Sequence, residues 1–129
     1  MCRIDGAERC MVIQSKDRKA AKMHLCSECG REIALGETYH YETTIFEGSR
    51  DSSKTCAHCM VGREWLIKNC GGFIYGEVIE EIQEHGDEYP KLRLPLYRVV
   101  AGARRKWQRF GNGLMTVPKM PPPISVHEH

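Results

Sequence analysis

The 129-residue chain has few aromatic residues and no long apolar run, and these shortages exclude several classes of protein. Aromatic residues make up 8% of the chain, too few for a large core, so a bound metal would help to stabilise it. No segment approaches the roughly 18 to 20 consecutive apolar residues that a membrane span requires. The N-terminal MCRIDGAERC also lacks the basic-then-apolar pattern of a secretory signal. We therefore expect a soluble, cytoplasmic protein with no membrane partner.

The chain also lacks the recurring sequence motifs of catalysis. We find no HExxH motif, no phosphate-binding glycine loop, no carboxylate pair in a defined frame and no nucleophile with an orienting base. The glycine-bounded GGFIYGEV does not have the spacing of a phosphate loop. We therefore expect a protein that is not an enzyme and that has no small-molecule substrate.

Cysteine, in contrast, is plentiful, and four of the seven cysteines form two CxxC pairs. In a reducing cytosol such pairs are better interpreted as metal ligands than as disulfides. Structural zinc takes four tetrahedral ligands, commonly thiolates, so we expect one structural Zn²⁺ ion. Rubredoxin-like iron, a redox dithiol and a metal-free pair of motifs are the alternatives. The expected ligands are Cys26, Cys29, Cys56 and Cys59.

The residues around the CxxC pairs predict a knuckle, a β-hairpin and a helix, in that order. Gly30 can adopt a positive φ, which lets a tight knuckle turn its amides towards the first two sulfurs. The segment TYHYETTIF is rich in residues that favour strands and lies between Gly36 and Gly48. After Cys56, AHCMVGREWLIKNC has helical spacing, and Gly71 supplies a left-handed stop. This order is typical of a treble-clef zinc finger.

Two further helices are expected after this unit. The first covers residues 75–85 and ends before Gly86. The second follows Pro95 and continues to Gly111, with an apolar stripe formed by Leu96, Val99, Val100, Ala103, Trp107 and Phe110. The predicted fold is therefore α+β. It has an extended segment at 1–19, a zinc-binding treble-clef-like unit at 20–72, a helical extension at 73–112 and a flexible proline-rich tail at 113–129.

The net charge of +2 conceals two segregated blocks of charge. Every charged residue within 77–88 is acidic, and every charged residue within 91–109 is basic. Two solvated helix faces that attract each other are the simplest interpretation. The basic block also predicts phosphate contacts by Arg98, Arg104, Arg105, Lys106 and Arg109. Trp107 or Phe110 could stack on a base if exposed, although core packing is favoured for Trp107.

The segments HLCSECGREIALGETYHYE and KTCAHC, with the following REWL, resemble small zinc-binding proteins encoded by tailed phages and prophages. The resemblance covers about residues 20–70. It implies a treble-clef or zinc-ribbon-like fold with the four CxxC cysteines as ligands, and it implies residence in the cytoplasm of a bacterial host. Most such proteins have no assigned activity, and the helices after Gly72 lie outside the pattern.

Three non-enzymatic functions follow from these features. The first is nucleic-acid binding through the basic helix at 91–109. The second is an inhibitor or adaptor that docks on a host protein or defence complex through an acidic face formed by Glu77, Glu80, Glu81 and Glu84. The third is self-association into a homo-oligomer, in which the acidic helix of one protomer meets the basic helix of another.

Overall fold

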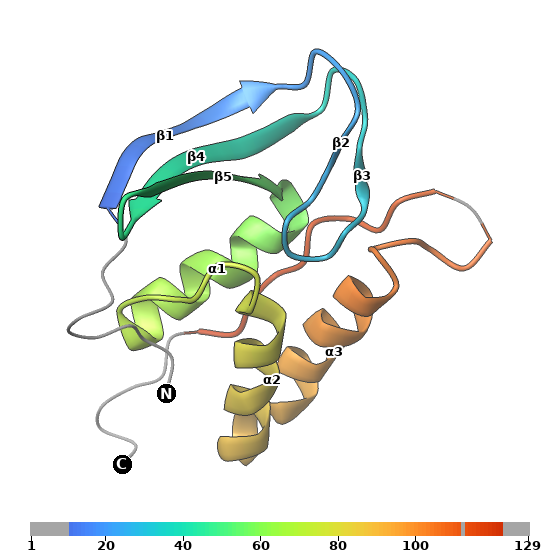
Figure 1. Cartoon of the computed structure of the whole chain (residues 1–129). Helices are drawn as coiled ribbons and strands as arrows, with labels where there is room; N and C mark the ends of the chain where they lie inside the picture. Colours follow the sequence, from blue (N-terminus) through green and yellow to red (C-terminus); the bar gives the residue numbers. More distant parts are fainter. Residues whose placement is uncertain (1–10, 112, 123–129) are drawn as a thin grey trace.

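A computed structural model describes residues 11–111 and 113–122 and shows a small α+β fold (Figure 1). A three-stranded antiparallel sheet in the order β1-β4-β5 lies against the helices, and the two short strands β2 and β3 form a second sheet. The strands are β1 (Met11–Lys19), β2 (His24–Leu25), β3 (Glu32–Ile33), β4 (Thr38–Phe46) and β5 (Ser49–Cys56). The helices are α1 (Ala57–Cys70), α2 (Val78–Glu88) and α3 (Arg93–Arg104), with a 3₁₀ turn at Pro90–Leu92. Within the described residues, every helix is too short or too polar to cross a lipid bilayer.

The predicted hairpin is formed by β4 and β5, and TYHYETTIF coincides with β4. Glu47 and Gly48 connect the two strands with φ values of 51° and 82°, as a tight two-residue hairpin turn requires. Strand β1 takes up residues 11–19 of the predicted N-terminal segment and pairs antiparallel with β4. The rest of that segment lies outside the described residues.

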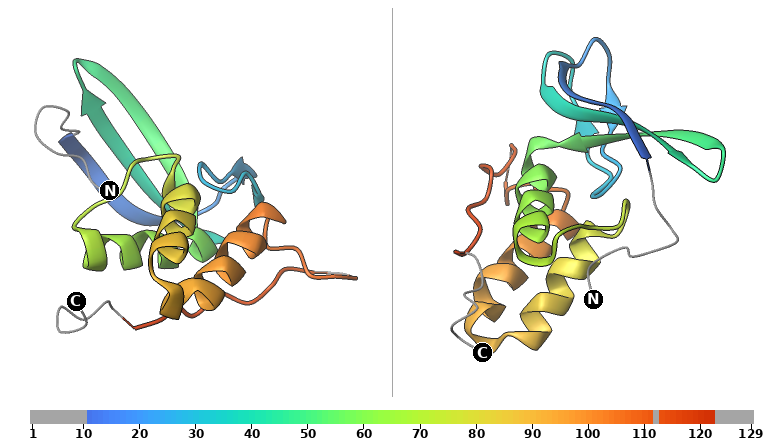
Figure 2. Two further views of the ribbon diagram at one scale, coloured as in Figure 1. Left: turned by 90° about the horizontal axis from the view of Figure 1, so that it is seen from below. Right: turned by 90° about the vertical axis from the view of Figure 1, so that its left-hand side faces the viewer.

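Alternation along the strands gives the sheet two distinct faces. We call the side that carries Glu42 the inner face, because the Glu42 carboxylate binds the Arg63 guanidinium of α1. Tyr39 and Tyr41 project from the opposite, outer face, since successive side chains of a strand alternate. Figure 2 shows α1, α2 and α3 all on the inner side of the sheet. The outer face is therefore the side of the sheet that no described helix covers.

Helix α1 has the predicted limits, but α2 is displaced from its predicted position. Helix α1 begins directly after Cys56 and ends at Gly71, which has a φ of 81°. Helix α2 begins three residues later than predicted and continues past Gly86. A Cβ atom at Gly86 would lie 2.8 Å from a ring carbon of Tyr97, so this glycine permits close approach of α3. The prediction that Gly86 ends the helix is therefore wrong.

Helix α3 ends at Arg104, and the prediction that it continues to Gly111 is wrong. Lys106 and Trp107 have φ values of 55° and 59°, which turn the chain back on the helix. The amide of Trp107 donates to the carbonyl of Gly102 at 2.8 Å, and the indole covers Gly102 so closely that only glycine fits there. Trp107 is 1% exposed, as favoured from the sequence, but Phe110 is 89% exposed and does not belong to the apolar stripe.

The described part of the predicted tail, residues 113–122, has no helix or strand of its own, but it contacts the body of the protein. The indole nitrogen of Trp65 donates to the carbonyl of Pro121 at 3.0 Å. The Nε2 atom of His58 forms a hydrogen bond with the carbonyl of Met115. The side chains of Met115 and Met120 pack against the core. Residues 113–122 are therefore fastened to α1, whereas 123–129 lie outside the described residues.

Candidate functional site

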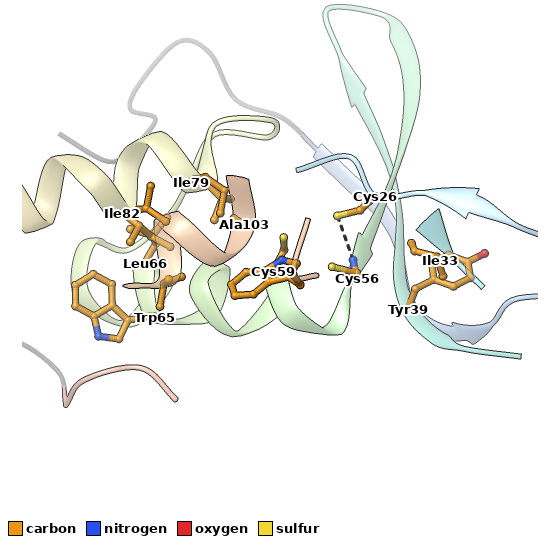
Figure 3. Close-up of a cluster of buried hydrophobic side chains, with 14 of the residues drawn as sticks. Cys26, Ile33, Tyr39, Cys56, Cys59, Trp65, Leu66, Ile79, Ile82 and Ala103 are labelled. Atoms are coloured by element: carbon orange, nitrogen blue, oxygen red, sulfur yellow. Dashed lines mark hydrogen bonds between the residues drawn. The ribbon is translucent and has the colours of Figure 1, made fainter. Parts of the chain in front are cut away.

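The four predicted ligands come together in one cluster. The sulfurs of Cys26, Cys29, Cys56 and Cys59 all lie within 4.8 Å of one another. Figure 3 shows Cys26 facing Cys56 where β5 enters α1, with Cys59 one turn along the helix. Tetrahedral coordination with metal–sulfur bonds of about 2.3 Å places sulfurs about 3.8 Å apart, and the Cys29 and Cys56 sulfurs are 3.9 Å apart. The cluster can therefore bind one metal ion.

Backbone geometry explains why the first CxxC pair forms a knuckle. Strands β2 and β3 pair on either side of it, and the amide of Cys26 donates to the carbonyl of Arg31 at 2.9 Å. The amide of Gly30 donates to the carbonyl of Cys26 at 3.0 Å, and Gly30 has the expected positive φ of 81°. The amides of Glu28 and Cys56 then lie 3.4 Å from the Cys26 sulfur. These donors favour a thiolate at Cys26.

The charges around the cluster also favour thiolates. The pKa of Cys26 lies well below its ordinary value, because the thiol of Cys29, followed by those of Cys56 and Cys59, donates to its sulfur. The buried guanidinium of Arg31 interacts with the Cys56 sulfur and is held by the Glu37 carboxylate. A divalent cation would complete the neutralisation, since metal-bound cysteines are deprotonated.

Four protein ligands leave a metal ion no open position for a substrate, so the cluster is suited to a structural role. Within residues 11–111 and 113–122, no other group of three or more cysteine, histidine or carboxylate side chains gathers in this way. The four-cysteine cluster is therefore the single candidate metal centre in the part of the chain that the structure describes.

The residues between the paired cysteines connect the cluster to the helices, which the sequence analysis missed. The Glu28 carboxylate accepts hydrogen bonds from the amides of Gly76 at 2.8 Å and Val78 at 3.1 Å, where α2 begins. Burial raises the pKa of Glu28, although the two amides oppose the shift. In the second CxxC, the His58 ring packs against the Trp107 indole with their centroids 5.2 Å apart. A contact across 48 or 50 sequence positions leaves no signal in local spacing.

A second polar cluster lies on the inner face and includes a Ser-His-Asp arrangement that spacing did not reveal. Ser15 Oγ lies 3.0 Å from His40 Nε2, and His40 Nδ1 lies 2.9 Å from Asp17. The Ser15 hydroxyl, however, donates to Glu42 at 3.1 Å, and His40 Nε2 lies equally close to that carboxylate. A serine whose proton is held by a carboxylate is not set up for attack, because the histidine must take that proton.

Glu42 makes this cluster a structural one. It is bound by Arg63 from α1 and by the hydroxyl of Tyr75 from the connection that precedes α2. Burial alone would raise the pKa of Glu42, but the Tyr75 hydroxyl and the Arg63 charge outweigh burial and lower it. The network therefore ties β1 and β4 to α1 and to the start of the helical extension.

The predicted basic residues lie mostly on the surface, and four of them gather in one turn. We call residues 104–110 the basic turn, which contains Arg104, Arg105, Lys106 and Arg109. The Arg105 guanidinium lies 3.7 Å from the ring centroid of Phe110. Arg98 is exposed but lies nearer the middle of α3. A groove of about 500 Å³ is lined by Gly30 of the knuckle and by Lys106, so the basic turn and the first CxxC knuckle share one groove.

One of the four glutamates predicted to form the acidic face is buried. Glu77, Glu80 and Glu84 are exposed, but Glu81 is 4% exposed and faces the interior. Glu81 therefore cannot contact a partner on this surface, which corrects the prediction. Within the described residues, no ion pair joins α2 to α3. The expected attraction between the two charge blocks therefore does not take the form of ion pairs, although the Arg104 guanidinium donates a hydrogen bond to the Gln83 side chain of α2.

No family model matches this chain, and comparisons with curated proteins and with solved structures also found no match.

Proposed function

We propose that this chain is a zinc-stabilised, non-enzymatic module that binds nucleic acid through the basic turn. The observation that carries the proposal is the concentration of four cationic residues in the basic turn, where the Arg105 guanidinium lies against a Phe110 ring that is 89% exposed. Lysine and arginine side chains neutralise phosphates, and an exposed ring can stack on a base. No acidic residue occurs within 89–122, so nothing in this segment opposes the approach of a polyanion.

Zinc is the ion that we propose for the four-cysteine cluster. A closed set of four thiolates with near-tetrahedral sulfur spacing suits zinc, which imposes no geometry of its own. A knuckle, a hairpin and a helix that supplies the last ligand support a treble-clef-like zinc finger, in agreement with the resemblance to phage-encoded zinc proteins. Elemental analysis of purified protein tests this assignment: one zinc per chain is expected, and one iron per chain would contradict it.

The buried Trp107 holds the basic turn in place for binding. Its amide donates a hydrogen bond to the carbonyl of Gly102, and its carbonyl accepts a hydrogen bond from the amide of Met115 at 2.6 Å. The indole is enclosed, and it packs against His58 of the second CxxC pair. A turn fixed in this way loses little conformational entropy when a ligand binds, so its cations act together.

The test measures binding of random-sequence duplex DNA at several salt concentrations by fluorescence anisotropy. In the triple variant Arg104→Gln, Arg105→Gln and Arg109→Gln, we expect weaker binding at every salt concentration. The slope of log affinity against log salt should decrease by about 0.9 for each phosphate that the variant no longer neutralises. A control variant carries Lys68→Gln and Lys119→Gln, which remove two exposed cations elsewhere, and its affinity and slope should change little.

An unchanged affinity and slope in the triple variant would contradict binding through the basic turn. Capture of a host protein after nuclease treatment, abolished when Glu77, Glu80 and Glu84 are replaced by Gln, would instead support an inhibitor or adaptor. Light scattering at low and high salt identifies self-association, which would appear as an oligomer that dissociates when salt is added.

A further inference from the structure

Among the described residues of the three-stranded sheet, those on the outer face include several cations and no carboxylate. Residues directly opposite one another on antiparallel strands share a face, and the register places Lys16 opposite Tyr41 and Tyr41 opposite Lys54. The same alternation sends Asp17, Glu42 and Asp51 to the inner face. The outer-face side chains from the bulge of β1 across β4 and up to Lys54 of β5 are Gln14, Lys16, Arg18, Tyr39, Tyr41, Thr43, Ile45, Arg50, Ser52 and Lys54.

The aromatic ring at the centre of this face responds to its positive charge. The pKa of Tyr41 is lowered by the hydroxyl of Thr43 and further by the charges of Arg18 and Lys54.

An aromatic ring lies in the middle of these cations. Tyr41 projects from the central strand with a lysine opposite it on each side. The Arg18 guanidinium lies 3.9 Å from the centroid of the Tyr41 ring, so the two form a cation–π pair. A guanidinium plane and an aromatic ring are both surfaces on which unpaired bases stack. The basic turn repeats this combination with Arg105 and Phe110.

We propose that the outer face of the sheet binds a single strand of nucleic acid. Lys16, Arg18 and Lys54 contact its phosphates, and an unpaired base stacks on the Arg18–Tyr41 pair. A single strand suits this face better than a duplex does, because stacking requires a free base and the face presents no described helix to enter a groove. The proposal adds a second surface to the proposed function, and it does not depend on the basic turn.

The test titrates fluorescent oligo(dT) and oligo(U) with the full chain at several salt concentrations. In the variant with Lys16→Gln and Lys54→Gln, the slope of log affinity against log salt should decrease by about 0.7 for each lysine. Tyr41→Leu should weaken binding about fivefold or more, whereas Tyr41→Phe keeps the ring and should bind as the parent does. Metal content and circular dichroism establish that each variant is folded.

Matched charge removal elsewhere, by Lys68→Gln with Lys119→Gln, should leave the single-strand slope unchanged. Binding of either oligonucleotide that depends on Tyr41 and the two lysines supports the proposal, and comparison of the two shows which of these strands binds more tightly. An unchanged slope in the Lys16 and Lys54 variant would overturn it, even if Tyr41→Leu failed to fold. Two further results would also overturn it. The first is that duplex DNA competes for the protein as effectively as single strands do. The second is that binding to anionic vesicles depends on these two lysines as strongly as binding to the oligonucleotides does.

These experiments can refute the sheet proposal and the basic-turn proposal independently of each other. If only the basic-turn variant loses single-strand binding, the sheet proposal is wrong and the proposed function stands. If the sheet variants lose single-strand binding while the basic-turn variant keeps its duplex affinity, the sheet proposal stands and the basic turn is not the binding surface.

Discussion

Replacing Glu81 by glutamine is expected to stabilise the folded protein, by an amount that grows as pH rises. The Glu81 side chain is 4% exposed, and neither carboxylate oxygen has a partner with hydrogen-bond geometry among the described residues. Burial raises its pKa from 4.5 to about 7. The nearby amide of Ile74 opposes this shift, and the charges of Glu77 and Glu84 add to it. Glutamine keeps the size of the side chain and removes the charge.

The sign and size of the effect follow from linkage between proton binding and folding. Because the folded protein holds the Glu81 proton more tightly than the unfolded chain does, this carboxyl costs nothing below the unfolded pKa of 4.5. Stability then falls as pH rises towards the folded pKa of about 7. Full ionisation costs about 3 kcal/mol, and at about pH 5 the cost is about 1 kcal/mol. The advantage of Glu81→Gln over the parent should therefore increase by about 2 kcal/mol between about pH 5 and about pH 8.

Urea denaturation of the metal-loaded parent and variant at the two pH values measures this difference. Taking the difference between two proteins with the same four-cysteine cluster removes the pH dependence that the metal contributes to both. The control is Glu80→Gln, which removes an exposed carboxylate from the neighbouring position of α2. A Glu81→Gln variant with the same advantage at both pH values, or with none, would refute the argument from burial.

Two further predictions concern the metal cluster and its connection to the helices. Cys26→Ser should release the metal and unfold the sheet and knuckle, because binding energy in such sites is largely folding energy; a metal-free variant that stays folded and protease-resistant would contradict this. Glu28→Ala leaves the first amides of α2 without their carboxylate and should lower the free energy of unfolding in urea by about 1 to 2 kcal/mol. Glu28→Gln, which keeps one acceptor, should lose less, and equal stability of all three proteins would show that the cap contributes nothing.

Short-range patterns predicted the parts of this fold that depend on neighbouring residues. The strand TYHYETTIF, the start of α1 after Cys56 and its end at Gly71 all follow from spacing over a few positions. The four candidate metal ligands were found for the same reason, since each CxxC pair is a local unit and two such pairs suffice for one ion.

Predictions from sequence spacing were wrong where the backbone leaves the helical conformation, and where a side chain distant in sequence determines the limit of a helix or the burial of a residue. Trp107 and Phe110 continue the spacing of the α3 stripe, but the helix ends at Arg104, and the positive φ values of Lys106 and Trp107 turn the chain away from the helical path. Gly86 resembles a helix stop, yet Tyr97 from the next helix requires a glycine there. Glu81 belongs to an acidic block in the sequence, and only its place on the buried side of α2 distinguishes it from its neighbours.

The residues inside the two CxxC pairs connect the candidate metal cluster to the proposed binding surface, which contains none of the four cysteines. Glu28 holds the start of α2, and α3, whose end leads into the basic turn, packs against α2. His58 packs against Trp107, the anchor of that same turn. Two separate sets of contacts thus connect the CxxC pairs to the basic turn, one through Glu28, α2 and α3 and the other through His58 and Trp107. Removal of a metal bound at this cluster should displace both Glu28 and His58, so the nucleic-acid binding proposed for the basic turn should require the metal even though no phosphate would contact it.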